Sequence, residues 1–329
     1  MQYVFTLPEH RQSAVVAVSA FDGVHIRHQR LLAETMTIAK QLDVTPIALL
    51  PWPPVMAEPG EMNDQALDGL LTTLDERLAL LARIAPEARP VVLAADAAKP
   101  WSPALLTERI MNGWDVRGLV TDSLADEALC GMQLADVVRQ HGVAVITLPD
   151  EAAAVPLGAQ IRDALSEGRV AQAAQHLTYE YTLSAEVVGG DRRGRLLGFP
   201  TANLRVDANK VLPANGIYAV RVGLPGDRCA SRPAVASVGV RPTFGDNNAR
   251  LVEVYLLDMS MDLYGVRITT TFVEWLRSEE RFDTVEALIR QMSEDVAQAR
   301  LRLGNIHQAS ESGAGRLRPQ FMHQGDAHP

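Results

Sequence analysis

The sequence predicts a first domain of the α/β class, built on a parallel sheet, followed by a domain of antiparallel strands. In the first half, short apolar runs alternate with amphipathic segments, which is typical of parallel strands joined by helices. From about Leu177, runs of β-branched and aromatic residues are separated by glycine, proline, asparagine and aspartate, which indicates an antiparallel barrel or sandwich. The 329 residues suffice for two domains, each with a core of its own.

The first half opens with an apolar run at residues 14–20, and a helical pattern follows to about Lys40. Further strands are expected at 44–50, 89–95, 116–122 and 143–148, with helices at 64–85, 103–112 and 126–141. Ligands of such sheets bind at the carboxyl ends of the strands. The stretch FDGVHIRH, at 21–28, follows the first strand and is therefore where a site is expected.

In the second half, strands are expected at 179–188, 216–224, 234–240, 251–258 and 266–276. The last element reads as a helix that Asp283 caps, with Glu286 three residues later completing a box-like pair. Its apolar face is expected to comprise Val285, Leu288, Ile289, Met292 and Val296. Residues 304–329 lack periodicity and are expected to form a disordered tail.

Composition excludes several classes of protein. The net charge of −9 argues against a broad nucleic-acid-binding surface. Two distant cysteines, Cys130 and Cys229, exclude a disulfide framework and a four-cysteine zinc site, and fit a reducing cytosol. The start has no signal-peptide pattern, and no apolar run approaches the roughly 18–20 residues that span a bilayer. A cytoplasmic protein without nucleic-acid or membrane partners is expected, and homo-oligomerisation stays open.

The stretch GGDRRGRLLGFPTANL, at 189–204, carries the strongest local signal for chemistry. Its glycines allow close approach of the backbone to a ligand, and backbone N–H groups in such a loop can cradle phosphates. Thr201 and Asn203 supply a hydroxyl and an amide oxygen, which suit Mg²⁺ beside phosphates. The alternative is a flexible hairpin with solvated arginines. No G-K-[ST] follows, so this is not a Walker A loop.

Several motifs in the second half occur in one order: GDRRGRLLGFPTANL, LPANGIYAVRV, ASVGVRPTFG, VEVYLLD, DLYGVRI and the final FVEWLRSEERF helix region. This order closely resembles the riboflavin kinase domain of the prokaryotic bifunctional riboflavin kinase/FAD synthetase family, over about residues 178–303. The resemblance implies a six-stranded Greek-key barrel that converts ATP and riboflavin to ADP and FMN with Mg²⁺. The domain bounds expected from it are 1–176 for an adenylyltransferase-like α/β domain and 177–303 for the kinase.

The resemblance also implies roles for single residues. Glu253 matches the general base toward the flavin 5′-hydroxyl; the alternative is a solvent-facing strand glutamate. Thr201 and Asn203 match the metal and phosphate ligands. The ATP-binding set implied by the family is Gly190, Asp191, Gly194, Gly198, Pro200, Thr201 and Asn203.

Arg277, Glu280 and Phe282 match a segment that borders the flavin in the family. Phe282 could stack on the isoalloxazine, or it could anchor the last helix in the core. Tyr255 departs from the family, which often has histidine there.

The first half resembles the family's Rossmann-like nucleotidyltransferase-type domain, which adenylylates FMN to FAD, but four of its motifs are altered. The loop G-N-F-D-G-V-H-x-G-H has Ser19 and Ala20 for Gly-Asn, and Arg27 between His25 and His28 where the family has glycine. That glycine lies where phosphates meet a helix N-terminus. The motif F-x-P-H-P lacks its histidine at 50–53, and the loop after Val120 is unrecognisable. Of S-S-T-x-I-R, at 157–162, only Ile161 and Arg162 remain.

These losses predict a riboflavin kinase whose first domain has lost catalysis, because such contacts stabilise a transferring nucleotidyl group. The alternatives are a bifunctional riboflavin kinase/FMN adenylyltransferase and, from another class, a non-catalytic flavin- or nucleotide-binding regulator. His25 and His28 share a helix face, so a metal site is a further reading. A structural role at the helix start is the favoured one.

Overall fold

The computed structural model describes residues 11–52, 69–94, 101–122, 131–148, 156–190, 194, 197–226, 231–240, 250–259 and 261–312. Its first half holds a five-stranded parallel sheet in the order β3-β2-β1-β4-β5. The strands are β1 (Gln12–Val18), β2 (Thr45–Trp52), β3 (Arg89–Ala94), β4 (Trp114–Asp122) and β5 (Val145–Leu148). The expected parallel α/β sheet is confirmed.

Helices cover both faces of this sheet, because alternate residues of each strand point to opposite sides. Val15 and Ala17 belong to one core with the helices α1 (Ile26–Leu42) and α2 (Leu74–Ile84). Ala14 and Val16 belong to a second core with α3 (Pro103–Gly113) and α4 (Gly131–Gln140). The short 3-10 turn η1 (Asp22–Val24) joins β1 to α1 at the carboxyl edge of the sheet.

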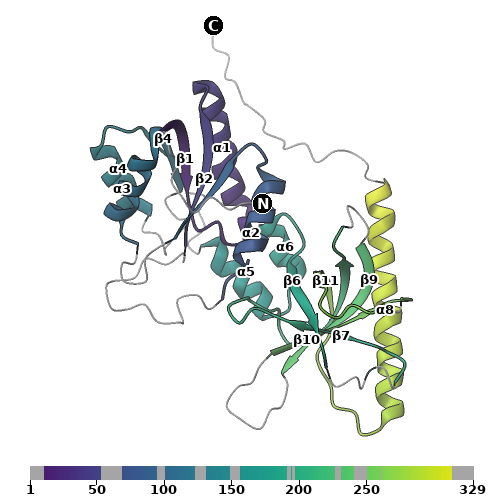
Figure 1. Cartoon of the computed structure of the whole chain (residues 1–329). Coiled ribbons are helices and arrows are strands. Elements are labelled where there is room, and N and C mark those ends of the chain that lie inside the picture. Colours follow the sequence, from purple (N-terminus) through teal and green to yellow (C-terminus); the bar gives the residue numbers. More distant parts are fainter. Residues whose placement is uncertain are drawn as a thin grey trace.

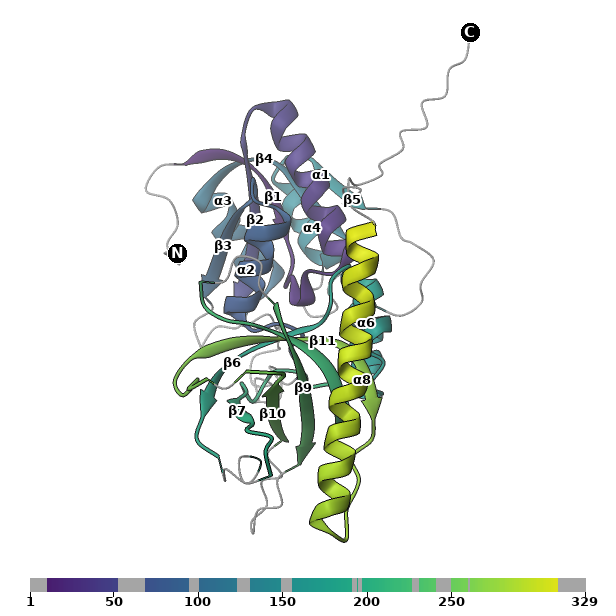
Figure 2. The ribbon, with the colours of Figure 1, turned by 90° about the vertical axis from the view of Figure 1, so that its right-hand side faces the viewer.

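The second half is a closed antiparallel barrel of six strands in the order β10-β7-β6-β11-β8-β9. The strands are β6 (Thr182–Val188), β7 (Ala202–Arg205), β8 (Gly216–Gly223), β9 (Ser231–Val240), β10 (Arg250–Leu256) and β11 (Arg267–Arg277). The expected six-stranded barrel is confirmed. The long helix α8 (Val285–Ser312) runs along the outside of the barrel, and Ala299 and Leu303 pack against Ala219 and Val273 (Figure 2).

Two further helices, α5 (Leu157–Ser166) and α6 (Val170–Leu177), lie at the junction of the two halves (Figure 1). Sequence analysis assigned no helices to these residues. Their apolar side chains share one core with the inside of the barrel, as for Ile161 and Leu165 with Tyr218. Helices α5 and α6 therefore pack on the barrel and not on the parallel sheet.

The bounds of several elements differ from those expected. Helix α2 begins at Leu74 and not at 64, because Thr73 and Glu76 form a capping box there; residues 64–68 lie outside the described part. No strand was expected at the 4-residue β7, because its run is too short for a periodic signal.

Helix α8 differs from its expected form at both ends. Thr284 Oγ1, and not Asp283, accepts from the Ala287 backbone N–H at 3.1 Å, and Val285 is 54% exposed rather than part of the apolar face. The helix continues to Ser312, so the expected disordered tail is wrong for 304–312. No proline interrupts this stretch, and each added residue gains a backbone hydrogen bond. Residues 313–329 lie outside the described part. No helix in that part is long and apolar enough to cross a membrane.

Candidate active site

A cavity of about 290 Å³ lies between the outer wall of the barrel and helix α8. The residues that line it are Gly194, Leu197, Phe199, Thr201, Ile217, Val235, Ser237, Glu253, Tyr255, Arg277, Glu279, Glu280, Phe282, Leu288, Met292, Asp295 and Val296. This volume lies near the lower end of the range for ligand pockets, about 300–1,000 Å³. The cavity brings together six sequence-predicted site residues that are up to 88 positions apart in the chain, from Gly194 to Phe282.

Glu253 stands on β10 between two residues that fill the barrel. Val252 and Val254 are fully buried in the barrel core, so the alternation of the strand directs Glu253 outward into the cavity. The neighbouring strand β7 places Asn203 directly opposite Glu253. Thr201 Oγ1 lies 3.4 Å from Glu253 Oε2. The carboxylate of Glu253 and the hydroxyl of Thr201 therefore line one edge of the cavity together, while Asn203 does not line it and lies across from Glu253 on β7.

The glycine-rich loop approaches these groups closely. A Cβ at Gly190 would overlap the side-chain amide of Asn203, so glycine is needed for the approach. Gly194 accepts backbone hydrogen bonds from Leu197 and Phe199, at 3.1 and 2.8 Å, which closes a tight turn at the cavity wall.

The remaining loop residues of the expected ATP-binding set lie farther from the first cavity. Gly198 has a φ of +86°, which only glycine adopts readily, and neither it nor Pro200 lines that cavity. Asp191 lies outside the described residues.

A second cavity, of about 320 Å³, adjoins the first through Thr201, which lines both. Pro200 and Ala202 form its near side. Its other walls are Val187, Leu256, Met259, Met261, Asp262, Leu263 and Tyr264. This second cavity was not predicted from the sequence, because its residues come from three separate stretches of the chain.

Arg277 and Phe282 line the first cavity beside helix α8, and the Arg277 guanidinium carbon lies 5.9 Å from the Phe282 ring centroid. Glu280 also lines it and is exposed. Sequence analysis missed Asp295, which pairs with Arg277. The signal was available: a lone acidic residue on the apolar face of the last helix, between Met292 and Val296.

The histidines of the first domain are buried beside η1. The rings of His25 and His28 stack with centroids 3.7 Å apart, and the residues are 3% and 2% exposed. Among the described residues, no hydrogen-bond partner reaches either ring nitrogen of His28. Burial, then the charges of His25, Arg77 and Arg27, lowers the pKa of His28 well below its usual value. Arg27 is itself 7% exposed, which fits a structural helix start.

The alternative in which His25 and His28 bind a metal ion is not supported by the structure. In the part of the chain that the structure describes, no group of three or more histidine, cysteine, aspartate or glutamate side chains is placed to hold a metal ion.

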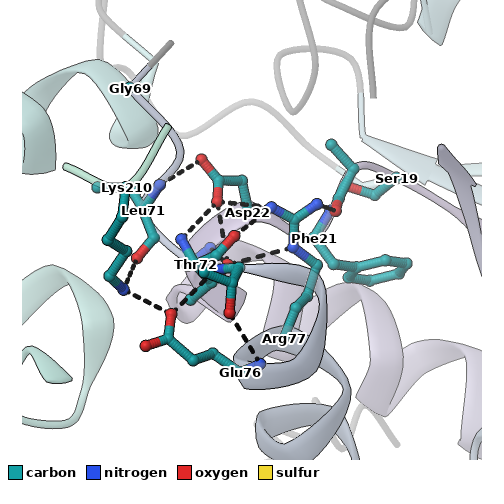
Figure 3. A network of polar contacts seen from close by, with 12 residues as sticks. Ser19, Phe21, Asp22, Gly69, Leu71, Thr72, Glu76, Arg77 and Lys210 are labelled. Carbon is teal, nitrogen blue, oxygen red and sulfur yellow. Dashed lines mark hydrogen bonds and ion pairs between the residues drawn. The ribbon is translucent and has the colours of Figure 1, made fainter. Parts of the chain in front are cut away.

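Arg162, the remnant of S-S-T-x-I-R, contacts Asp22 of η1. Its Nη2 lies 2.5 Å from Asp22 Oδ2, and its Nε donates to the Gly69 carbonyl at 2.6 Å. Arg77 binds the other oxygen of Asp22 at 2.8 Å, and Leu71 and Thr72 donate backbone N–H groups to the same carboxylate (Figure 3). Burial raises the pKa of Asp22, but the two guanidinium groups and these N–H groups hold it below its usual value.

The Asp22 cluster continues into the barrel domain through Glu76 and Lys210 (Figure 3). Lys210 Nζ lies 2.7 Å from Glu76 Oε2 and donates to the Leu71 carbonyl at 2.6 Å. Glu76 also accepts from the Ser184 backbone N–H of β6 at 2.7 Å. Asp22 thus joins a structural network between the halves, which the sequence did not predict.

Comparison with known proteins places this geometry in a family. The family model for riboflavin kinase matches residues 177–303, and the one for FAD synthetase matches residues 7–93. A bifunctional riboflavin kinase/FMN adenylyltransferase of Pseudomonas fluorescens is 33% identical over 310 residues, covering 89% of this chain and 94% of the relative. That of Listeria monocytogenes is 31% identical over 298 residues, covering 85% and 90%.

The chain belongs to the bifunctional riboflavin kinase/FMN adenylyltransferase family. A crystal structure described as a macrolide-efflux protein from Streptococcus pneumoniae shares the fold, with a TM-score of 0.74 at 24% identity over 89% of this chain and 95% of that chain.

The bifunctional names of these relatives and the FAD synthetase match bear on the first domain. They do not support the loss of adenylyltransferase activity that the four altered motifs led us to expect, and the bifunctional alternative fits them better.

Proposed function

We propose that the cavity between the barrel and α8 is the active site of a riboflavin kinase, which transfers the γ-phosphate of ATP to the 5′-hydroxyl of riboflavin and releases FMN and ADP. The observation that carries this proposal is the meeting of Glu253 and Thr201 at one edge of the cavity, with Asn203 opposite Glu253 on the neighbouring strand. Arg277, Glu280 and Phe282 form the opposite side, where we place the flavin. The proposed domain bounds are 1–176 and 177–303.

Glu253 is the proposed general base. Its carboxylate reaches into the cavity from a rigid strand, where it can accept the proton of the 5′-hydroxyl as the new P–O bond forms. The hydroxyl of Thr201 and the amide of Asn203 lie beside it and would orient the phosphates. Their oxygens, with the carboxylate, are the donors that Mg²⁺ takes, so the site fits this ion. When bound with ATP, Mg²⁺ offsets the charge on the transferring phosphate.

We place the nucleoside of ATP in the second cavity. Thr201 lines both cavities, so a phosphate chain that crosses it would point its terminal group at the flavin hydroxyl beside Glu253. The apolar side chains of Leu256, Met259 and Leu263 suit a flat aromatic base.

The decisive experiment compares Glu253→Gln with the wild type, using ATP, Mg²⁺ and riboflavin, with FMN and FAD separated by chromatography. We expect Glu253→Gln to abolish FMN formation while ATP binding persists. Glu186→Gln is the matched control, because Glu186 is another strand glutamate of the barrel that lines neither cavity. An unchanged rate in Glu253→Gln would remove this residue from the mechanism. Tight flavin binding without FMN in the wild type would favour the non-catalytic regulator.

The second candidate function is FMN adenylyltransferase in the first domain, favoured by the FAD synthetase match at residues 7–93 and by the bifunctional relatives. Supplying FMN and ATP directly tests it without the kinase step. Formation of FAD supports a bifunctional enzyme. If all the FMN is recovered unchanged while the protein still phosphorylates riboflavin, the first domain has no adenylyltransferase activity.

A further inference from the structure

Arg277 borders the proposed flavin cavity, yet all three of its guanidinium nitrogens are bonded within the protein. Nε and Nη2 donate to the two carboxylate oxygens of Asp295, each at 2.7 Å. Nη1 donates to the Ser278 carbonyl at 2.9 Å. A bidentate arginine–carboxylate pair fixes both distance and orientation. Arg277, at the end of β11, therefore holds helix α8 in one geometry.

Asp295 is an unusual residue for its place. It lies on the face of α8 that packs on the barrel, near Val296 and Ala299, and is 6% exposed. A carboxylate this buried is costly unless a cation and further donors surround it. Arg277 supplies the cation, and Gln291 Nε2 donates to Oδ1 at 3.2 Å. An apolar residue at this position could pack against the barrel equally well. The carboxylate of Asp295 therefore fixes the orientation of Arg277 rather than filling space.

The pair closes a short loop over the cavity. Residues 278–284 connect β11 to α8 and carry Glu279, Glu280 and Phe282 along the cavity wall. Arg277 precedes this connection, and Asp295 lies about three helical turns into α8. Leu288 and Met292, on the intervening turns, line the same cavity. A shift of α8 would therefore move the whole wall opposite Thr201 and Glu253.

We propose that Asp295 is a positioning residue for riboflavin: through Arg277 it fixes the α8 wall of the flavin cavity. This inference rests on the proposed kinase function. We expect the pair to affect the binding of riboflavin and not that of ATP, because Asp295 lines the first cavity and not the second.

Asp295→Asn tests this by steady-state kinetics, with each substrate varied in turn. We expect the KM for riboflavin to rise at least tenfold, while the KM for ATP stays within twofold and kcat within threefold. A titration that follows riboflavin fluorescence measures the Kd without turnover, and we expect the same loss of affinity there. Because the two residues act as a unit, the double variant Arg277→Gln/Asp295→Asn should bind riboflavin no more weakly than Arg277→Gln alone.

Glu274→Gln is the matched control, since Glu274 pairs with Arg302 between the same two elements, β11 and α8, but half-exposed and outside both cavities. Its kinetics should equal those of the wild type. If Asp295→Asn fails to fold, Gln291→Leu removes one hydrogen bond from the same carboxylate and should raise the riboflavin KM about threefold. An unchanged riboflavin KM, or an equal rise for ATP, overturns the inference. A wild type that makes no FMN overturns the kinase proposal instead.

Discussion

Replacing Lys210 by methionine should open the junction between the two halves of the protein. Lys210 and Glu76 form an ion pair across this junction, with side chains 0% and 7% exposed and charged atoms 2.7 Å apart. Removing one partner of such a pair costs about 3–5 kcal/mol, because the other charge stays buried. Glu76 keeps two backbone N–H donors, from Thr73 and Ser184, which places the expected cost near the lower end, at about 3 kcal/mol.

The double variant Glu76→Gln/Lys210→Met should recover most of this loss. Burial lowers the pKa of Lys210, whereas the Glu76 carboxylate opposes this shift. The double variant has neither buried charge, so it avoids the free-energy cost of the unpaired carboxylate that the single variant leaves in the junction.

Hydrogen exchange measures this opening without requiring two-state unfolding of the whole chain. The backbone N–H groups of Leu70 and Val211 bond across the junction, to Asn209 and Leu70 respectively. A loss of about 3 kcal/mol corresponds to exchange about 100-fold faster at these amides. Lys40→Met is the control, since Lys40 is exposed on α1. Exchange within threefold of the wild type in Lys210→Met, or equal losses in the single and double variants, would refute the reasoning.

Three further predictions address the sites. Thr201→Ala should slow FMN formation by about 100-fold while Thr201→Ser retains most of it, as measured by initial rates, because a positioned donor to a reacting phosphate contributes about that much. Gly190→Ala should displace the side chain of Asn203, which its Cβ would overlap, and so raise the KM for ATP while the thermal midpoint changes little. Because the folded pKa of His28 is lowered, only the unfolded chain gains this proton as the pH falls. Stability should then fall by about 1.4 kcal/mol per pH unit below about 6.5, and His28→Gln should lessen this slope in urea titrations; identical slopes would contradict it.

Local patterns in the sequence predicted every strand of the parallel sheet and five of the six barrel strands, β7 being the exception. The alternation of Val252, Glu253 and Val254 predicts a strand with one polar face, and the structure places this glutamate in the cavity. Thr201 and Asn203 were named because the resemblance matches them to the family's metal and phosphate ligands, and the structure places Thr201 just before β7 and Asn203 within it. Such predictions hold because side-chain direction along a strand depends on neighbours one or two residues away.

Ion pairs between distant segments of the chain could not be predicted from the sequence. Asp22 and Arg162 are 140 residues apart, and no local pattern links them, so their ion pair was not predicted. The helices α5 and α6 were missed for a related reason. Both are short, and their apolar faces complete the barrel core rather than the sheet that precedes them in the chain.

The sequence by itself predicted a parallel α/β domain followed by antiparallel strands, because periodicity is a local property. The order of its motifs carried the family resemblance, which implied the six-stranded barrel and the residues proposed for the kinase cavity. Only the tertiary structure decided which charges pair: Asp22 with Arg77 and Arg162, Glu76 with Lys210, and Arg277 with Asp295. A charge can be buried only where a partner and hydrogen-bond donors converge on it, and that convergence depends on how whole elements pack.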